Sequence, residues 1–129
     1  MKRTKKVLLV LFGIVLLLLI VGKVMIGNMV DKIQNVSIIT PDLSEISNGD
    51  YIGEYSALPV YVKVQVSVNN HRITDIAILQ HDNGLGNAAE TITIDVIQRQ
   101  SLDVDAISGA TVSSKCILKA VENALRGEK

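Results

Sequence analysis

An uninterrupted apolar segment near the N-terminus constrains this chain more than any other feature. Val7 to Gly22 contains sixteen residues without a charge, and Val24 to Gly27 extends the segment beyond the single cation Lys23. An α-helix needs about 20 apolar residues to cross the hydrocarbon core of a bilayer. The segment Val7 to Gly27 is therefore long enough to span a membrane when the Lys23 ammonium extends to the interface.

The charges around this segment predict its orientation. Four cations precede it: Lys2, Arg3, Lys5 and Lys6. Positive residues stay on the cytoplasmic side, so we expect a single-pass plasma-membrane protein whose N-terminus is cytoplasmic and whose C-terminal part is extracytoplasmic. A cleaved signal peptide has similar features. However, Gly22-Lys23-Val24 and Gly27-Asn28-Met29 both fail the small-x-small cleavage pattern, which favours an uncleaved anchor.

The rest of the chain suffices for one small domain. We divide the sequence into an anchor at 1–27, a stalk at 28–48 and a domain at 49–129. In the stalk, apolar residues from Val30 to Ile39 are compatible with a short continuation of the helix, which Pro41 ends. Five of the 13 basic residues precede Asn28, which leaves eight basic against 13 acidic residues downstream. This acidic balance argues against nucleic-acid binding. One cysteine excludes an intramolecular disulfide, and with only two histidines it argues against a zinc site.

Alternating residues predict an antiparallel sheet. Val60 to Val68 places valine at every second position, which is the pattern of a half-buried strand. Asn69-Asn70 suits a tight hairpin turn, and Arg72 to Leu79 is the expected return strand. Strict alternation would place Ile73, Ala77 and Leu79 on one face of that strand, and Ile76 and Ile78 on the other. Tyr51 to Tyr55 is a further short strand.

Two helices are expected after the sheet and a loop at His81 to Asn87. Ala88 to Gln100 fits both a helical face and an alternating strand, but its length and its Asn87-Ala-Ala-Glu start favour a helix. Val112 to Arg126 has one apolar face that includes Cys116, which we expect to be a core residue, and Gly127 is the expected stop. The predicted fold is therefore α+β: a small antiparallel sheet packed with about two helices, after one transmembrane helix.

Four hydroxyl side chains and two small residues crowd the start of the last helix, in the run Asp105-Ala106-Ile107-Ser108-Gly109-Ala110-Thr111 and the Val112-Ser113-Ser114-Lys115 that follows it. The N–H groups and the positive dipole of a helix N-terminus bind anions, most commonly phosphate. Gly109 and Ala110 allow a bulky partner to approach the backbone, whereas Asp105 either organises the turn or binds a metal brought by another protein. The alternative is an ordinary helix cap made by Ser108 or Thr111.

The pattern Asp105-x-x-Ser108-Gly109-Ala110-Thr111 resembles the flavinylation motif D-x-x-[S/T]-G-A-T of the FMN-binding domain family. That family includes the C and G subunits of the sodium-pumping quinone reductase and Rnf complexes. The resemblance extends from about Gly49 to Leu125, because the Gly49–Tyr55 opening, the hairpin of Val60–Val68 and the final helix are also similar.

The resemblance implies that FMN is attached covalently to the Thr111 hydroxyl through its phosphate. A separate magnesium-dependent flavin transferase would recognise Asp105, Ser108, Gly109 and Ala110, take FMN from FAD and release AMP. His81 and Tyr55 are candidate contacts for the flavin ring. No catalytic residue and no metal ligand is assigned in this chain.

Three functions are compatible with these features. The first is an extracytoplasmic electron carrier that passes electrons between unidentified redox partners. The second is a flavin-dependent reductase, or a subunit of one, that acts outside the membrane. The third is a non-redox extracellular binding module in which Ser108–Thr111 is a plain helix cap. The sequence contains no second cofactor motif and no acid/base pair at a suggestive spacing, which favours a carrier over a stand-alone enzyme.

Overall fold

The structure is a computed structural model that describes residues 1–82 and 87–128. The chain forms two compact units, Met1–Lys32 and Ile33–Lys129, which are described separately. The first unit is most of α1 (Lys2–Gln34), a helix of 33 residues. Its apolar side chains between Val7 and Ile26 are exposed. Within the described residues, α1 is the one helix that is long and apolar enough to cross a bilayer.

The second unit is built on a three-stranded antiparallel sheet in the order β1-β2-β3. The strands are β1 (Gly49–Ala57), β2 (Val60–Asn69) and β3 (Arg72–Asp82). The five alternating valines of β2 are at most 5% exposed, which confirms the predicted half-buried strand. The β2–β3 turn consists of Asn70 and His71, whose φ angles of 50° and 59° are the left-handed pair that a two-residue hairpin requires.

The alternation of β3 is interrupted at two points. Its register with β2 shifts twice, so that Thr74 and Leu79 have no partner in the ladder. Each extra residue reverses the face of the residues that follow it. Ile73 and Ile76 are therefore both buried, while Leu79 is 49% exposed. The expectation that Ile73 and Leu79 share a face is wrong for this reason.

The expected loop at His81 to Asn87 is shorter than predicted. His81 belongs to β3, where it lies opposite Val62, so its assignment to a loop is wrong. The central residues of that expected loop, 83–86, lie outside the described residues. The chain continues at Asn87 with a 3₁₀ turn, η2 (Asn87–Thr91).

The two predicted helices are both present. α2 (Ile92–Arg99) follows η2 directly, so the helical interpretation of residues 88–100 is confirmed, with a 3₁₀ first turn. α3 (Thr111–Arg126) ends at Gly127, whose φ is 70°. The Gly127 N–H donates to Ala124 O at 3.2 Å and the Glu128 N–H to Asn123 O at 2.8 Å, which is the bonding of a Schellman motif. The predicted α+β class and the predicted stop are therefore confirmed.

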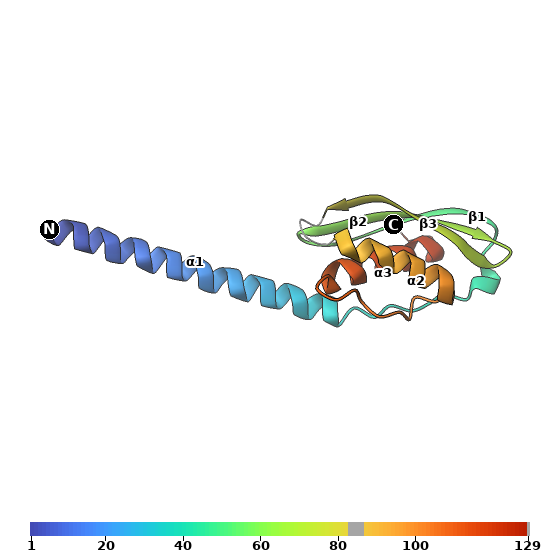
Figure 1. Cartoon of the computed structure of the whole chain (residues 1–129), viewed down its shortest axis with the longest axis horizontal. Helices are drawn as coiled ribbons and strands as arrows, with labels where there is room; N and C mark the ends of the chain where they lie inside the picture. The colour runs from blue at the N-terminus through green and yellow to red at the C-terminus, as the bar shows by residue number, and fades with distance from the viewer. Residues whose placement is uncertain (83–86, 129) are drawn as a thin grey trace. The chain divides into compact units, whose positions relative to one another are not determined.

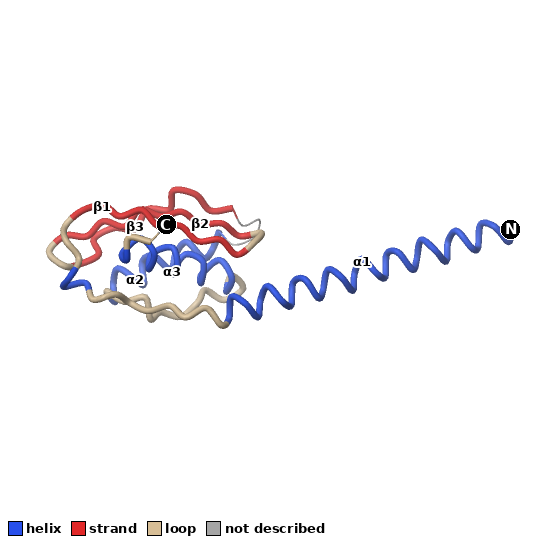
Figure 2. Tube along the Cα trace, turned by 180° about the vertical axis from the view of Figure 1, so that it is seen from behind, coloured by secondary structure: helices blue, strands red, loops and turns tan. Residues whose placement is uncertain are grey.

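The sheet and the helices form two layers. Figures 1 and 2 show the three strands on one side of the domain and α2 and α3 against one face of the sheet. At Gly53 of β1 the strand closely approaches α3, because a Cβ there would collide with the carbonyl oxygen of Ala120 and the backbone of Ala124. Cys116 faces the sheet from α3 and is fully buried, which confirms its expected core position.

Residues 33–48 cover α3 on the side away from the sheet. Ile33 is fully buried and Ile46 is 9% exposed. Three partly buried side chains pack against the same core: Val36, Ile38 and Leu43. The segment includes a 3₁₀ turn, η1 (Leu43–Glu45), which begins where Asp42 Oδ1 accepts a 2.9 Å hydrogen bond from the Ser44 N–H. From Ile33 onward, the segment expected as a stalk is thus part of the hydrophobic core.

Candidate functional site

The Asp105–Thr111 segment lies in the connection between α2 and α3, at one end of the domain. The chain leaves α2 at Arg99 and returns along the helices to the start of α3, beside the turn between β1 and β2 (Figure 1). The Cys116 thiol in the second turn of α3 lies beside the backbone of Ala57, the last residue of β1, so the start of α3 is close to this turn. Thr111 is the first residue of α3.

A buried hydroxyl fixes the conformation of this segment. The Ser114 side chain is fully buried, and its Oγ accepts a 2.9 Å hydrogen bond from the Ile107 N–H. The same hydroxyl donates to Ala110 O at 2.8 Å. The Ala110 N–H closes the turn on Ile107 O at 3.0 Å, with Gly109 between them at a left-handed φ of 78°. The turn is therefore bonded at both ends before any ligand is present.

Neither hydroxyl of the motif caps the helix. The N-cap residue is Ala110, whose side chain cannot accept a hydrogen bond. Within the described residues, the hydroxyls of Ser108 and Thr111 make no hydrogen bond, so the alternative in which one of them caps the helix is wrong. The N–H groups of the first three helical residues have no acceptor within the helix. Two features of an anion site, free N–H donors and the positive end of the dipole, therefore coincide at Thr111.

Most of the motif is accessible from solvent. Asp105, Ser108, Gly109 and Thr111 are exposed, whereas Ala110 is 8% exposed. A Cβ on Gly109 would meet nothing within 4 Å, so the backbone there is open to an approaching group. Asp105 makes no hydrogen bond with the described part of the chain, and the turn is organised by Ser114 instead. Asp105 is thus available to a group outside this chain.

Tyr55 and His81 lie in the sheet, in β1 and β3, and not in the Asp105–Thr111 segment. They flank Val62 in one cross-strand row, on the face that α3 covers. The His81 imidazole is 2% exposed, and its Nδ1 lies 2.9 Å from Glu90 Oε1 of η2. This row is at the motif's end of the domain, but Thr111 and the sheet-facing Cys116 are roughly 140° apart around α3. Among the described residues, neither Tyr55 nor His81 hydrogen-bonds the motif.

Two residues that support the motif were not predicted. Ser114 belongs to the predicted group of hydroxyl residues at the helix start, but its role in the turn was not predicted, although a serine four residues after Ala110 has the spacing of a side-chain bond to that carbonyl. Thr40 Oγ1 accepts a 2.8 Å hydrogen bond from the Leu102 N–H and so ties residues 33–48 to the loop that leads to Asp105. No local signal marks Thr40, because its partner is 62 residues away.

Comparison with known proteins gives two findings. The family model of the FMN-binding domain matches residues 55–126, which include the Asp105–Thr111 motif and all of α3. The chain is also 33% identical over 103 residues to NADH:acrylate oxidoreductase of Vibrio harveyi. That similarity covers 74% of this chain and 9% of the length of the relative.

Proposed function

The chain belongs to the FMN-binding domain family, and we propose that it is a membrane-anchored extracytoplasmic electron carrier with FMN attached covalently to Thr111. The observation that carries the proposal is the exposed Thr111 hydroxyl at the first residue of α3, within the Asp105–Thr111 motif. FMN, when attached, supplies one- and two-electron chemistry. The remaining steps concern what this chain's own residues do.

The geometry around Thr111 fits a phosphodiester. The linked phosphate keeps one negative charge, and the N-terminus of a helix stabilises such a charge by about 0.3–1 kcal/mol at an exposed position. The free N–H groups of Thr111, Val112 and Ser113 are the nearest donors. The open space over Gly109 leaves room for the group that the phosphate carries.

The attachment is a phosphoryl transfer to a hydroxyl. The Thr111 oxygen forms a bond to the phosphorus of the FMN half of FAD, the pyrophosphate bond breaks, and AMP leaves. The hydroxyl proton passes to a base of the magnesium-dependent flavin transferase, which is the proposed modifying partner. Asp105, Ser108 and Gly109 are exposed beside Thr111, so the transferase can contact them directly.

A covalent bond suits a domain with little aromatic surface. A site that holds a flavin reversibly is lined by apolar and aromatic side chains. Of the three tyrosines in this domain, Tyr51 and Tyr55 pack against the core, and Tyr61 donates a 2.8 Å hydrogen bond to Glu54 Oε2. A tether makes high affinity unnecessary and leaves the ring accessible to docking partners. Tyr55 and His81 are proposed ring contacts because their row lies at the motif's end of the domain.

The first experiment tests the attachment. The full-length chain is produced with and without a flavin transferase, alongside Thr111→Ala and the control Ser113→Ala, whose serine lies in the same helical turn. Intact mass and in-gel flavin fluorescence are then recorded. We expect an FMN adduct in the wild type and in Ser113→Ala only when the transferase is present, and none in Thr111→Ala. A wild-type chain that stays unmodified in the presence of active transferase would refute the proposal and favour a non-redox binding module.

A second experiment separates a carrier from a reductase. The relative is named for an NADH:acrylate oxidoreductase, but this chain spans 9% of its length. The flavinylated chain is therefore assayed for flavin reoxidation by acrylate and related small acceptors, with and without added redox proteins. Sustained turnover of a small molecule by this chain alone would replace the carrier with the reductase alternative.

The proposed topology rests on the four cations that precede the apolar segment of α1. A C-terminal alkaline phosphatase fusion is expected to be active, because that enzyme folds only outside the cytoplasm. Replacing the four cations with glutamine should lower this activity. An inactive fusion of the wild-type chain at normal abundance would place the domain in the cytoplasm instead.

A further inference from the structure

α3 carries a charged stripe on the side that faces away from the sheet. Cys116 and Asn123 mark the sheet side, since the Asn123 amide donates to Glu54 O of β1 at 2.9 Å. The stripe consists of four residues spaced three or four apart: Lys115, Lys119, Glu122 and Arg126. Thr111 continues the same stripe, one turn before Lys115. The proposed acceptor hydroxyl and the stripe therefore share one face of the helix.

The charges of this stripe are not all balanced. Glu122 is 2% exposed and pairs with two cations, Lys119 Nζ at 2.9 Å and Arg126 Nε at 3.1 Å. Lys115 has no carboxylate partner in the part of the chain that the structure describes. Its Nζ donates one hydrogen bond of 3.0 Å to the carbonyl oxygen of Gln34. An ammonium group has three donors, so two of them remain for an anion.

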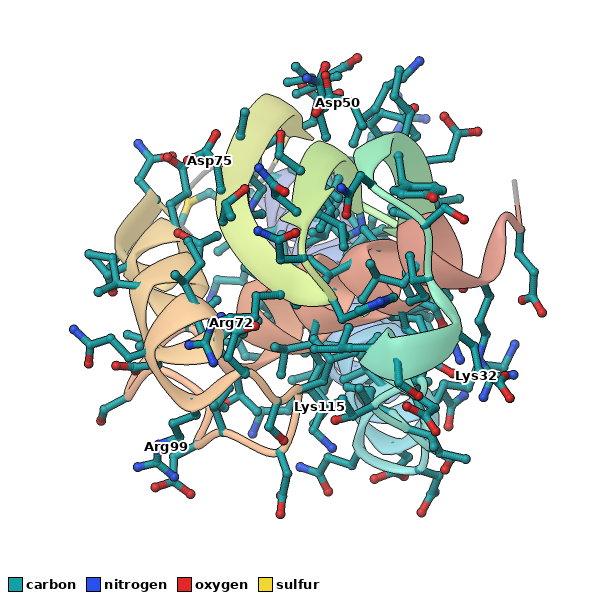
Figure 3. All side chains as sticks on the ribbon, turned by 90° about the vertical axis from the view of Figure 1, so that its right-hand side faces the viewer. Lys32, Asp50, Arg72, Asp75, Arg99 and Lys115 are labelled. Carbon is teal, nitrogen blue, oxygen red and sulfur yellow. The ribbon has the colours of Figure 1, made fainter. Side chains whose placement is uncertain are left out.

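The position of Lys115 directs it toward Thr111. Side chains on an α-helix lean toward the N-terminus, so residue i+4 lies over the turn that contains residue i. In Figure 3, Lys115 lies on the opposite side of the domain from Asp50 and Asp75 of the outer sheet face. Lys119 lies two turns from Thr111, and its charge is matched by Glu122.

We propose that the Lys115 ammonium binds the phosphodiester on Thr111, as a positioning residue that orients the attached FMN. This inference rests on the proposed function. The phosphate would receive a charge-assisted hydrogen bond from Lys115 Nζ in addition to the N–H groups of the first turn. One end of the cofactor is thereby fixed against α3, so the flavin ring samples a smaller volume than a single flexible tether would permit.

The test compares each variant with and without FMN. Full-length Lys115→Gln and the matched control Lys119→Gln are purified in detergent micelles, each unmodified and after modification by the transferase. The loss of the Gln34 contact affects both forms of Lys115→Gln equally and cancels in the difference. Unfolding in urea is followed by circular dichroism, and the ³¹P NMR signal of the phosphodiester is recorded for the modified forms.

In the wild type and in Lys119→Gln, attachment of FMN is expected to lower the unfolding equilibrium constant. In Lys115→Gln, the factor by which FMN attachment lowers this constant should be roughly two- to fivefold smaller than in the wild type. This is the range expected for a half-exposed ion pair. The ³¹P shift should change in Lys115→Gln alone. The inference would be overturned if FMN attachment stabilised Lys115→Gln as much as the wild type, or if Lys115→Gln and Lys119→Gln lost equal amounts of this stabilisation. In either case, an FMN adduct on Thr111 would leave the proposed function standing. A wild-type chain without adduct would overturn both.

Discussion

The Ser114 hydroxyl accepts a 2.9 Å hydrogen bond from the Ile107 N–H, across the turn that presents Thr111. Replacing Ser114 with alanine leaves the Ile107 N–H without its acceptor. It also removes the side-chain bond to Ala110 O, which still accepts the Ser114 N–H. We expect Ser114→Ala to lower the free energy of unfolding by about 1–3 kcal/mol, the cost of an unsatisfied buried group. We also expect slower flavinylation, because the loop before Thr111 loses its fixed conformation.

The matched control is Ser113→Ala, the adjacent serine, which makes no hydrogen bond with a described residue. Urea unfolding and the initial rate of FMN incorporation are measured for both variants. If Ser114→Ala flavinylates at the wild-type rate, the hydroxyl stabilises the fold without shaping the acceptor loop.

The segment 33–48 leads to a prediction about truncation. A fragment of residues 49–129 lacks the buried Ile33 and Ile46 and exposes the far side of α3. Each isoleucine contributes about 1.5–3 kcal/mol through burial. Their combined loss is comparable with the total stability of a small domain, roughly 5 kcal/mol at the lower end. We expect the fragment 33–129 to unfold cooperatively and the fragment 49–129 to lack a cooperative transition.

The two fragments are compared by circular dichroism during thermal unfolding and by the dispersion of amide signals in NMR spectra. A full-length chain in detergent provides the reference for the intact domain. Should both fragments unfold cooperatively at similar temperatures, residues 33–48 would be a dispensable covering and the domain would begin near Gly49.

Substitution of Gly53 by alanine, although it adds only one methyl group, is expected to lower the stability of the domain strongly. A Cβ at this position would lie 2.7 Å from the Ala124 Cα, with backbone atoms on either side that no side-chain rotation can remove. Gly53→Ala must therefore separate β1 from α3, and we expect a loss of about 3 kcal/mol or more. Ser56→Ala, an exposed position of the same strand, should change stability by less than about 0.5 kcal/mol. Comparable urea midpoints for the two variants would show that the helix can move away freely.

Local patterns in the sequence predicted most of the fold. The alternating valines of β2, the apolar face of α3 and the stop at Gly127 depend on neighbouring residues, and all three are confirmed. The bulges at Thr74 and Leu79 were missed because a period of two assumes an unbroken ladder. A bulge inserts a residue without changing composition or hydrophobicity, so no local property of β3 marks its position.

The parts of the site that involve distant residues were not predictable in the same way. The motif placed Thr111 at the start of α3, but the contacts that support the motif join Thr40 to Leu102 and Gln34 to Lys115. These pairs are 62 and 81 residues apart, and no spacing rule relates such positions. The segment that supplies Gln34 and Thr40 mixes apolar and polar residues and is broken at Pro41, so its pattern is too irregular to predict an element, and only its packing on α3 reveals its role.

Cys116 provides a last prediction, on reactivity and pH. Burial raises the pKa of its thiol from the ordinary value of 9.0 to about 11. The folded chain therefore keeps the thiol proton to a higher pH than the unfolded chain does. The stability linked to this group is complete below pH 9.0 and is lost as the pH rises through about 11. At neutral pH, the folded protein should react with iodoacetamide far more slowly than the same chain in urea.

Alkylation is measured by intact mass across a urea titration at pH 8, and labelling should follow the unfolding transition. Ser56→Cys in a Cys116→Ala background supplies an exposed thiol, which should react quickly without urea. Because α3 holds both Cys116 on its sheet side and Thr111 at its start, attachment of FMN that stabilises α3 should shift the labelling transition to higher urea. Rapid labelling of Cys116 in the folded chain would show instead that α3 separates from the sheet without global unfolding.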